Sequence, residues 1–455
     1  MPRSFKIGGW LLAALALAGC APRATLPTPP ELDLLAREHR LAQAWIGVAL
    51  QDADGRTLLQ WNAEKLFVPA SNQKVLTAAA ALELLGPDYR FATLVRRTSP
   101  RSLTLVCSGD PSLTSDDLRR LALQTALAWA GDTVDTLYLH PWALDTVHYG
   151  PGWMWDDFPY AFSAPVAAAT VNENLIWLYC GHGRCFEDPR FPGPLRFEVA
   201  EHRRCRWQAD TLVLPVPPDS GLVHTYRVIR EPERFVLQVF RGFLAEAGLP
   251  VGAVALWPES RADSLEGDTL ALHRSKPLRF LVTHLLKVSD NLYAEILFKT
   301  VGAAVYGPPG TWAKGRRALD SLWQAWHLPV HLVRIADGSG LSRYNQVAPA
   351  FLVALLQRVR NRPWFPDFLA ALPVAGQDGT LEGVDFGVPG GVRAKTGTMT
   401  GVRCLSGYLF PQGIPRRPLV FSIMANNTGV RRAVVDSLIG DFLQRVHQAA
   451  LAGGL

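Results

Sequence analysis

Ser71 and Lys74 stand three residues apart at the head of an apolar run. The run, residues 75–85, is rich in alanine and leucine and stops at Gly86-Pro87, so it predicts a helix that is buried on nearly all sides. Ser71 would cap this helix or lie in its first turn, where side chains three residues apart share a face. A serine hydroxyl becomes a nucleophile when a base takes its proton, and a desolvated lysine can be that base. On its own, so short a pattern more often marks a capping serine and a solvated lysine.

Two further motifs follow along the chain. One is Ser289-Asp290-Asn291, within a stretch that predicts a helix carrying Ser289, and the other is Lys395-Thr396-Gly397-Thr398. Ser-x-x-Lys, Ser-Asp-Asn and Lys-Thr-Gly, in this order, are typical of penicillin-binding proteins and class A β-lactamases. The chain therefore resembles a serine D,D-peptidase of the penicillin-binding superfamily.

The spacing of the motifs narrows this resemblance. More than 200 residues separate Lys74 from Ser289, which is room for one or two inserted domains. With this gap and four short stretches, the chain is similar to peptidase family S13, the D-alanyl-D-alanine carboxypeptidases/endopeptidases or class C low-molecular-mass penicillin-binding proteins. The likeness runs from about Trp45 to Asn427 and is weak from Cys180 to Val228. The four stretches are Gly109-Asp110-Pro111, the aromatic loop 150–165, Asp337–Arg343 and Leu372–Leu381.

The resemblance implies an α+β fold. In this family a transpeptidase-like domain, built on an antiparallel five-stranded sheet flanked by helices, carries two nested inserted domains. Residues 431–449 predict a closing helix. The five expected strands are 45–51, 57–61, 392–398, 402–410 and 418–426. The expected domains are a catalytic domain (31–92 and 270–455), an inserted domain II (93–175 and 228–269) and a small β-rich domain III (176–227).

The amino terminus predicts export. Residues 1–20 read as a signal peptide, because Arg3 and Lys6 precede an apolar core that is too short to span a membrane. Leu17-Ala18-Gly19-Cys20 resembles a bacterial lipoprotein box, which implies a lipid on Cys20 and anchoring in the cell envelope, on the periplasmic side. A plain secretory signal cut near Ala21 would instead remove Cys20. Residues 21–30 contain four prolines and predict an extended tether.

The composition is that of an ordinary globular protein, with 48% hydrophobic and 19% charged residues. A net charge of +6 without a dense basic run argues against nucleic acid as a partner. Five cysteines follow Cys20, so at least one is unpaired. Cys180 and Cys185 could close a short loop, or either could join Cys205. A metal site with His182 is less favoured because the spacing matches no strong zinc pattern, and we expect neither metal nor cofactor.

The resemblance also implies a role for each residue of the first two motifs. Ser71 would attack the carbonyl of the penultimate D-Ala, with Lys74 as general base. Alternatively, Lys74 acts only through its charge while protons move through Ser289 or water. Ser289 would pass a proton to the leaving amine, and Asn291 would bind the substrate amide and hold Lys74. Asp290 is expected to be structural.

The third motif is expected to bind the end of the substrate. Lys395 would neutralise the terminal carboxylate of D-Ala-D-Ala, and Thr396 would assist through its hydroxyl. Gly397 would let the substrate lie against the strand edge. The backbone N–H groups of Ser71 and Thr398 would form the oxyanion hole.

A pocket for the peptide side chain is implied at four further positions, namely Asp157, Phe162, Arg343 and Thr400. Asp157 would accept the free amino group of a diaminopimelate or lysine residue. Asp157 and Phe162 could equally well be a packing pair within the aromatic loop. In the same loop, Trp153 and Trp155 are expected to pack.

The sequence thus predicts a peptidoglycan D,D-carboxypeptidase/D,D-endopeptidase that acts through a Ser71 acyl-enzyme and is inhibited by β-lactams. A serine β-lactamase would use the same motifs, but the long insertion and the lack of a convincing Glu-x-x-x-Asn loop argue against it. A non-catalytic envelope-binding or sensor protein would keep the fold, although all three motifs are intact.

Overall fold

The structure, a computed structural model, describes residues 25–181, 184–188, 190–200, 205–209, 211–216, 223–388, 390–411 and 417–453. The predicted signal peptide, Cys20, residues 21–24 of the tether and His182 lie outside these residues. Among the helices that the structure describes, none has both the length and the apolar character needed to cross a bilayer.

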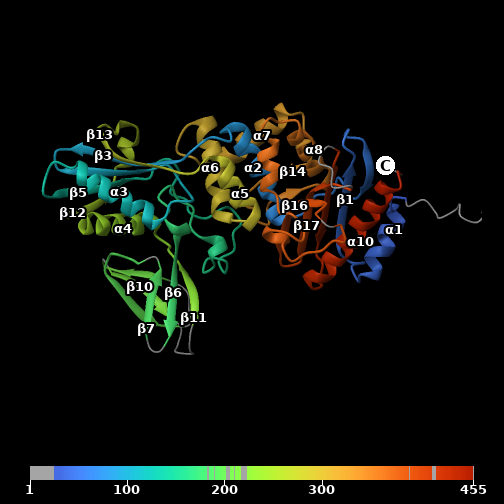
Figure 1. Ribbon diagram of the computed structural model, residues 1–455, viewed down its shortest axis with the longest axis horizontal. Helices are drawn as coiled ribbons and strands as arrows, with labels where there is room; N and C mark the ends of the chain where they lie inside the picture. Colours follow the sequence, from blue (N-terminus) through green and yellow to red (C-terminus); the bar gives the residue numbers. More distant parts are fainter. Residues whose placement is uncertain are drawn as a thin grey trace, which may run out of the picture.

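A five-stranded antiparallel sheet forms one end of the molecule (Figure 1). Its order is β16-β17-β18-β1-β2, so β18, from near the carboxyl terminus, lies between β17 and the amino-terminal β1. Helices cover both faces, which explains why β17 and β18 are buried along their whole length. The predicted α+β class is confirmed. The strands are β1 (Trp45–Gln51), β2 (Thr57–Trp61), β16 (Val392–Met399), β17 (Val402–Leu409) and β18 (Leu419–Asn426).

Helices α1 (Pro29–Glu38) and α10 (Arg432–Leu451) pack together on one face of this sheet (Figure 1). Helix α1 begins inside the predicted tether, so the expectation of extended chain up to residue 30 is wrong for its last two residues. Proline is tolerated in the first helical turn because the N–H groups there have no partner within the helix. The Glu31 carboxylate accepts hydrogen bonds from the backbone N–H and the hydroxyl of Thr28, at 2.6 and 2.9 Å.

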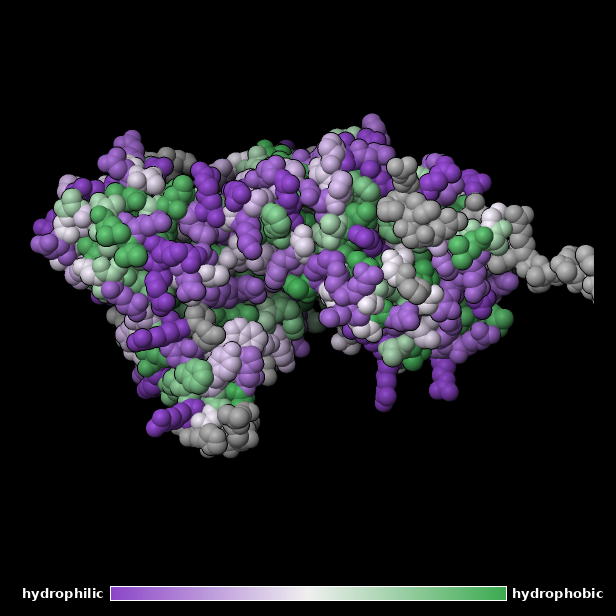
Figure 2. All heavy atoms as spheres, viewed as in Figure 1, coloured by the Kyte–Doolittle hydropathy of each residue, from purple (hydrophilic) through white to green (hydrophobic). Residues whose placement is uncertain are grey.

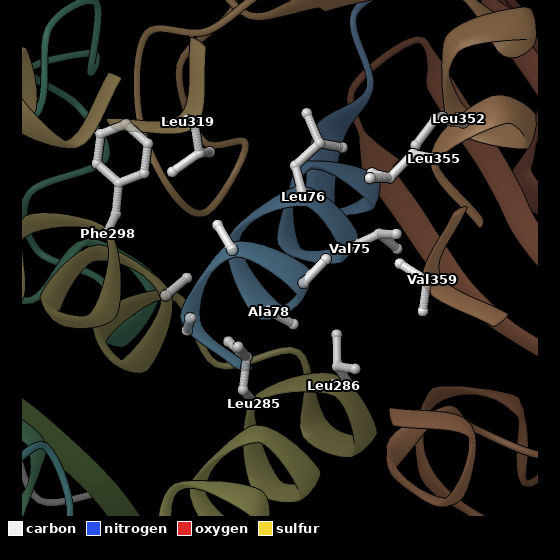
Figure 3. Close-up of a cluster of buried hydrophobic side chains, with 14 of the residues drawn as sticks. Val75, Leu76, Ala78, Leu285, Leu286, Phe298, Leu319, Leu352, Leu355 and Val359 are labelled. Atoms are coloured by element: carbon white, nitrogen blue, oxygen red, sulfur yellow. The ribbon is translucent and has the colours of Figure 1, made fainter. Parts of the chain in front are cut away.

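Helix α2 (Gln73–Leu84) lies at the centre of a group of helices next to the five-stranded sheet. Its residues from Gln73 to Leu82 are all buried, as the apolar run predicts. Figure 3 shows α2 surrounded by apolar side chains of four helices that follow much later in the chain. These are α5 (Leu278–Val288), α6 (Asn291–Tyr306), α7 (Trp312–Ala325) and α8 (Pro349–Arg360).

A second, mixed sheet of order β12-β5-β4-β3-β13 lies at the opposite end of the molecule (Figure 1). Helices α3 (Ser115–Ala128) and α4 (Pro232–Glu246) pack with it around one core. Strand β13 pairs with β3, so the chain enters this second part of the molecule and leaves it again on adjacent strands. The strands are β3 (Ala92–Ser99), β4 (Ser102–Cys107), β5 (Val134–His140), β12 (Val251–Leu256) and β13 (Asp268–Arg274).

A small β module projects from this second part. Figure 2 shows that the molecular surface is hollowed between the module and the end with the five-stranded sheet. A disulfide joins Cys180 and Cys185, while Cys205 is buried and free, so the shorter of the possible pairings is present. The module contains the sheets β11-β6-β7 and β8-β10-β9, with β6 (Leu175–Gly181), β7 (Arg184–Asp188), β8 (Leu195–Val199), β9 (Arg206–Gln208), β10 (Thr211–Val216) and β11 (Val223–Val228).

The remaining elements are short. They are α9 (Phe365–Ala371), β14 (Val333–Arg334), β15 (Gln346–Val347) and the 3₁₀ turns η1 (Ala70–Asn72), η2 (Ala161–Ser163), η3 (Asn172–Asn174), η4 (Glu259–Ser264), η5 (Val330–Leu332) and η6 (Gly379–Leu381).

Candidate active site

Ser71 lies in the 3₁₀ turn η1, directly before α2, and Lys74 lies in the first turn of α2. The Lys74 side chain is fully buried. Its Nζ lies 3.0 Å from Ser71 Oγ, 2.5 Å from Asn291 Oδ1 and 2.9 Å from the backbone oxygen of Ser339. The first and second motifs, far apart in sequence, thus meet at one amine.

Ser289 lies between two helices, and the prediction of a continuous helix through it is wrong. Helix α5 ends at Val288, and Ser289 adopts a left-handed conformation with φ 65° and ψ 41°. Asp290 then caps α6, because its carboxylate accepts a hydrogen bond from the Tyr293 N–H at 3.0 Å. The Asp290 carboxylate is therefore used at the start of the helix, while Asn291 Oδ1 accepts a hydrogen bond from Lys74 Nζ.

The third motif lies on β16, at the edge of the five-stranded sheet. Lys395 is fully buried, and its Nζ donates to Ser289 Oγ and to the backbone oxygen of Thr396, both at 2.9 Å. The Ala394 N–H bonds outward to Pro373, away from β17. Since backbone groups alternate along a strand, the N–H groups of Thr396 and Thr398 also face outward.

Gly397 lies against the turn that carries Ser71. A Cβ atom at this position would come within 2.4 Å of the Pro69 backbone oxygen and 2.9 Å of Asn72 Nδ2. The missing side chain therefore lets β16 pack on η1, and the expectation that it also makes room for substrate stays a prediction.

We predict that Gly397→Ala lowers the rate of penicillin acylation by about 10- to 100-fold. The methyl group must push β16 away from η1, and overpacking of this kind costs about 1–3 kcal/mol. Stopped-flow acylation and thermal unfolding of the same preparation would measure the two effects. Ala394→Gly, on the same strand, provides a control for a general change in strand stability, and equal rates in the wild type and Gly397→Ala would contradict the argument.

A cleft of about 230 Å³ joins these elements. Arg403, which the sequence did not suggest, lies on β17 beside it, with Nη1 donating to Thr398 Oγ1 at 2.7 Å and Nε donating to Asp436 Oδ1 at 2.6 Å. Among the residues that the structure describes, Arg403 Nη2 is buried and has no hydrogen-bond partner. The lining residues are Ser71, Ser289, Thr380, Thr396, Thr398, Arg403 and Arg432.

A buried carboxylate fixes the loop that faces Lys74. Glu295 on α6 accepts hydrogen bonds from the N–H groups of Gly338 and Ser339 at 2.9 and 2.8 Å, and from Trp312 Nε1 at 2.8 Å. The Ser339 carbonyl then points at Lys74 Nζ. The only sequence signal for this role is a glutamate inside an apolar helix.

Burial sets the electrostatics of the site. It lowers the pKa of Lys74 to about 8, against the opposing charges of Asp290, Glu295 and Asp337. Burial also lowers the pKa of Lys395 well below its usual value, and the charges of Lys74 and Arg403 add to this effect. Two amines that are normally charged at neutral pH are therefore pushed toward the neutral form.

Two of the four positions predicted for the side-chain pocket are joined directly, because Arg343 Nη2 donates to the Thr400 backbone oxygen at 3.0 Å. The backbone oxygen of Phe162 accepts a hydrogen bond from Asn291 Nδ2 at 2.6 Å, so the aromatic loop also touches the second motif. Burial raises the pKa of Asp157, and the charge of Arg343 lowers it. The Phe162 ring is exposed.

No metal or cofactor is needed to explain these contacts. The Cys180–Cys185 disulfide uses the two thiols that a site with His182 would need. Among the described residues, Glu173, His284 and Asp290 bring three metal-ligating side chains within 4.8 Å of one another. His284 Nε2 lies 3.4 Å from Asp290 Oδ2, which also fits an ion pair that steadies the cap of α6.

Known proteins are similar to this chain in both sequence and fold. A family model described as the D-Ala-D-Ala carboxypeptidase 3 (S13) family matches residues 30–183 and 208–440. A D-alanyl-D-alanine carboxypeptidase of an Actinomadura species is 32% identical over 91% of this chain and 84% of its own. The D-alanyl-D-alanine carboxypeptidase DacB of Haemophilus influenzae is 26% identical over 77% of this chain and 79% of its own.

Structural comparison agrees. The crystal structure of penicillin binding protein 4 (dacB) from Haemophilus influenzae superposes with a TM-score of 0.79 at 23% identity, covering 93% of this chain and 100% of that one. That protein has also been crystallised with a β-lactam, and this complex superposes with a TM-score of 0.74 at 22% identity, covering 91% of this chain and 99% of that one. From the matched sequence and the shared architecture, the chain belongs to the D-Ala-D-Ala carboxypeptidase 3 (S13) family.

Proposed function

We propose that this protein is a serine D-Ala-D-Ala carboxypeptidase of peptidoglycan that also cleaves D-Ala cross-links and is acylated by β-lactams. The observation that carries the proposal is the environment of Lys74 Nζ. Two of its three neighbours, Asn291 Oδ1 and the Ser339 carbonyl, can only accept hydrogen bonds, and the third is the Ser71 hydroxyl. A neutral amine has two N–H donors for the carbonyl oxygens and one lone pair for the hydroxyl proton.

The reaction follows from this arrangement. Lys74 takes the Ser71 proton as Oγ attacks the carbonyl of the penultimate D-Ala. The N–H groups of Ser71 and Thr398 stabilise the oxyanion, a contribution of about 3 kcal/mol for each well-placed donor. Ser289 then passes its proton to the leaving amine and regains one from the protonated Lys74, and water hydrolyses the acyl-enzyme to release the acid and restore the Ser71 hydroxyl.

The terminal carboxylate of the substrate binds beside β16. Lys395 is buried and short of compensating negative charge, so an entering carboxylate favours its ammonium form. Thr396 and Thr398 offer outward backbone and hydroxyl groups, and Arg403 Nη2 offers an unused donor. Binding of the terminal carboxylate thus restores the charge that burial disfavours.

The test is direct. Purified protein should release D-Ala from a pentapeptide that ends in D-Ala-D-Ala, and mass spectrometry should find a lasting penicilloyl adduct on Ser71. Fast repeated hydrolysis of nitrocefin would favour a β-lactamase instead. The absence of both D-Ala release and adduct formation would favour a non-catalytic envelope protein.

We predict that Asp157→Asn lowers kcat/KM about tenfold for stem peptides with a free side-chain amine. The loss of the carboxylate removes a charge-assisted hydrogen bond to the ammonium group. Penicillin acylation, which does not use that pocket, should be unchanged. The same peptide with an acetylated amine is the control, since both enzymes should cleave it equally; an unchanged preference would show that Asp157 only packs in its loop.

We predict that Glu295→Gln shifts the acid limb of the acylation pH profile downward by about half a pH unit or more. The Glu295 charge favours the protonated form of Lys74, so its removal lowers the pKa of Lys74. A variant with general damage would lose activity equally at all pH values. A ratio of variant to wild-type rate that is the same at pH 6 and pH 9 would contradict this role.

We also propose a lipid anchor on Cys20, which would place the enzyme on the periplasmic side of the bacterial cell envelope. The lipoprotein box supports this, and fractionation of Cys20→Ser, which should leave the membrane fraction, tests it.

For the three-part domain division, we propose to move the expected boundary at residue 269 to about 275, because β13 runs to Arg274.

A further inference from the structure

Five exposed apolar side chains lie on the two segments that carry Asp157 and Arg343 of the predicted side-chain pocket. We call this set the collar, and it consists of Met154, Trp155, Tyr160, Phe162 and Tyr344. Four belong to the aromatic loop 150–165, and Tyr344 directly follows Arg343. Trp155 and Tyr344 are 72% and 69% exposed. Exposed apolar side chains that lie close together on a protein surface often mark a binding site.

The two tryptophans of the loop have opposite environments. Trp153 Nε1 donates to the buried Asp337 carboxylate at 3.0 Å, and its ring meets the edge of Trp312. Trp155, only two residues later, keeps its indole in solvent, so the expectation that it packs is wrong. Packing of the loop therefore accounts for Trp153 and leaves Trp155 without a structural role.

Tyr344 lies where the two loops meet. A Cβ atom on Gly152 would come within 2.7 Å of the Tyr344 ring, so the ring rests on the backbone of the aromatic loop. Trp155 is two residues from Asp157 in the aromatic loop and Tyr344 directly follows Arg343, so both residues belong to the segments that carry the predicted pocket. Tyr160 and Phe162, stacked at 5.3 Å with an angle of 7° between their planes, extend the collar toward Asn291.

We propose that Trp155 and Tyr344 form a subsite that binds a sugar ring of the glycan strand of peptidoglycan. The proposal rests on the proposed function, which places a stem peptide in the neighbouring pocket. A pyranose ring has an apolar C–H face about the size of an aromatic ring, and it stacks on an exposed indole or phenol. The alanine, glutamate and diamino acid residues of a stem peptide offer no comparable flat apolar surface.

The length of the stem peptide fits this arrangement. Two residues and the lactyl ether of the sugar lie between the sugar ring and the diamino acid that would occupy the side-chain pocket, and an extended chain covers about 3.3–3.6 Å per residue. The sugar would then lie about 10 Å from the pocket, within reach of side chains that border it.

Three substrates separate the subsite from the catalytic site. They are glycan strands that carry pentapeptide stems, the free pentapeptide, and glycan strands stripped of peptide by an amidase. We expect Trp155→Ala and Tyr344→Ala to raise KM about tenfold for the first, to leave kcat/KM for the second and penicillin acylation unchanged, and to abolish calorimetric binding of the third. Trp155→Phe should restore most of the binding. Phe280→Ala, which removes an exposed ring from α5, is the matched control and should change none of these.

Three results would overturn the subsite. The wild type does not bind stripped glycan, the variants bind it as the wild type does, or the variants lose the same factor on the polymer and on the free pentapeptide. A wild type that fails to cleave the free pentapeptide would contradict the proposed function instead, and binding of stripped glycan would still decide the subsite.

Discussion

Ser71→Ala should abolish both penicillin acylation and D-Ala release, with a loss of about 10⁴-fold or more. Ser289 Oγ is not expected to replace Ser71 Oγ as nucleophile, because it is held by Lys395 rather than by Lys74. Loss of a catalytic serine costs about 10⁶-fold in well-studied serine peptidases, and only binding and oxyanion stabilisation remain. Mass spectrometry of the penicillin-treated protein and chromatography of released D-Ala measure the two reactions.

The fold should survive this substitution. Ser71 makes its hydrogen bond through Oγ alone, and alanine keeps Cβ in the same 3₁₀ turn. The melting temperature of Ser71→Ala should therefore stay within about 2 °C of the wild type, as for most substitutions that remove one partly exposed hydroxyl. An adduct that still forms in Ser71→Ala would assign the nucleophile to another residue.

Lys74→Arg should be nearly inactive, with a loss of about 10³-fold in the acylation rate. Arginine keeps a positive charge near Ser71 but cannot give up its proton at accessible pH, so it cannot be the base. If Lys74 acted only through its charge, Lys74→Arg would keep much of the activity that Lys74→Ala loses. The two variants, compared with the wild type by stopped-flow acylation, decide between the two roles.

The pH dependence tests the same amine without a mutation. A pKa of about 8 means that the base is mostly protonated at pH 6 and mostly neutral at pH 9. The acylation rate should thus rise about tenfold per pH unit below pH 8 and level off above it. A rate that is flat from pH 6 to pH 9 would exclude a neutral Lys74 as base.

The local features of this site follow from short sequence patterns. The strands β1 and β2 have the predicted bounds, and α2 is buried because its apolar residues surround it on all sides. The break at Ser289 was missed because the apolar pattern continues through it. The capping preference of Asp290, however, is visible in the sequence and marks a new helix start.

Contacts between distant segments were the part that sequence patterns did not reveal. Nothing in the sequence places Arg403 beside Asp436 or the Glu295 carboxylate on the Gly338 and Ser339 N–H groups, since both depend on tertiary packing. The roles of these charged side chains depend on their burial, which the sequence does not indicate because charged residues are usually exposed. The same limit explains Trp155, which was expected to pack because large aromatic side chains usually do.

The position of β18 has a consequence for biosynthesis. This strand completes the sheet between β17 and β1, and it is the last of the five strands to leave the ribosome or a secretion channel. Until it arrives, β1 and β2 form an isolated hairpin, which is only marginally stable in water. The nucleophile and the anion-binding strand therefore come together only after β18 has emerged, so we expect the hydrolase to be inactive until that strand is in place.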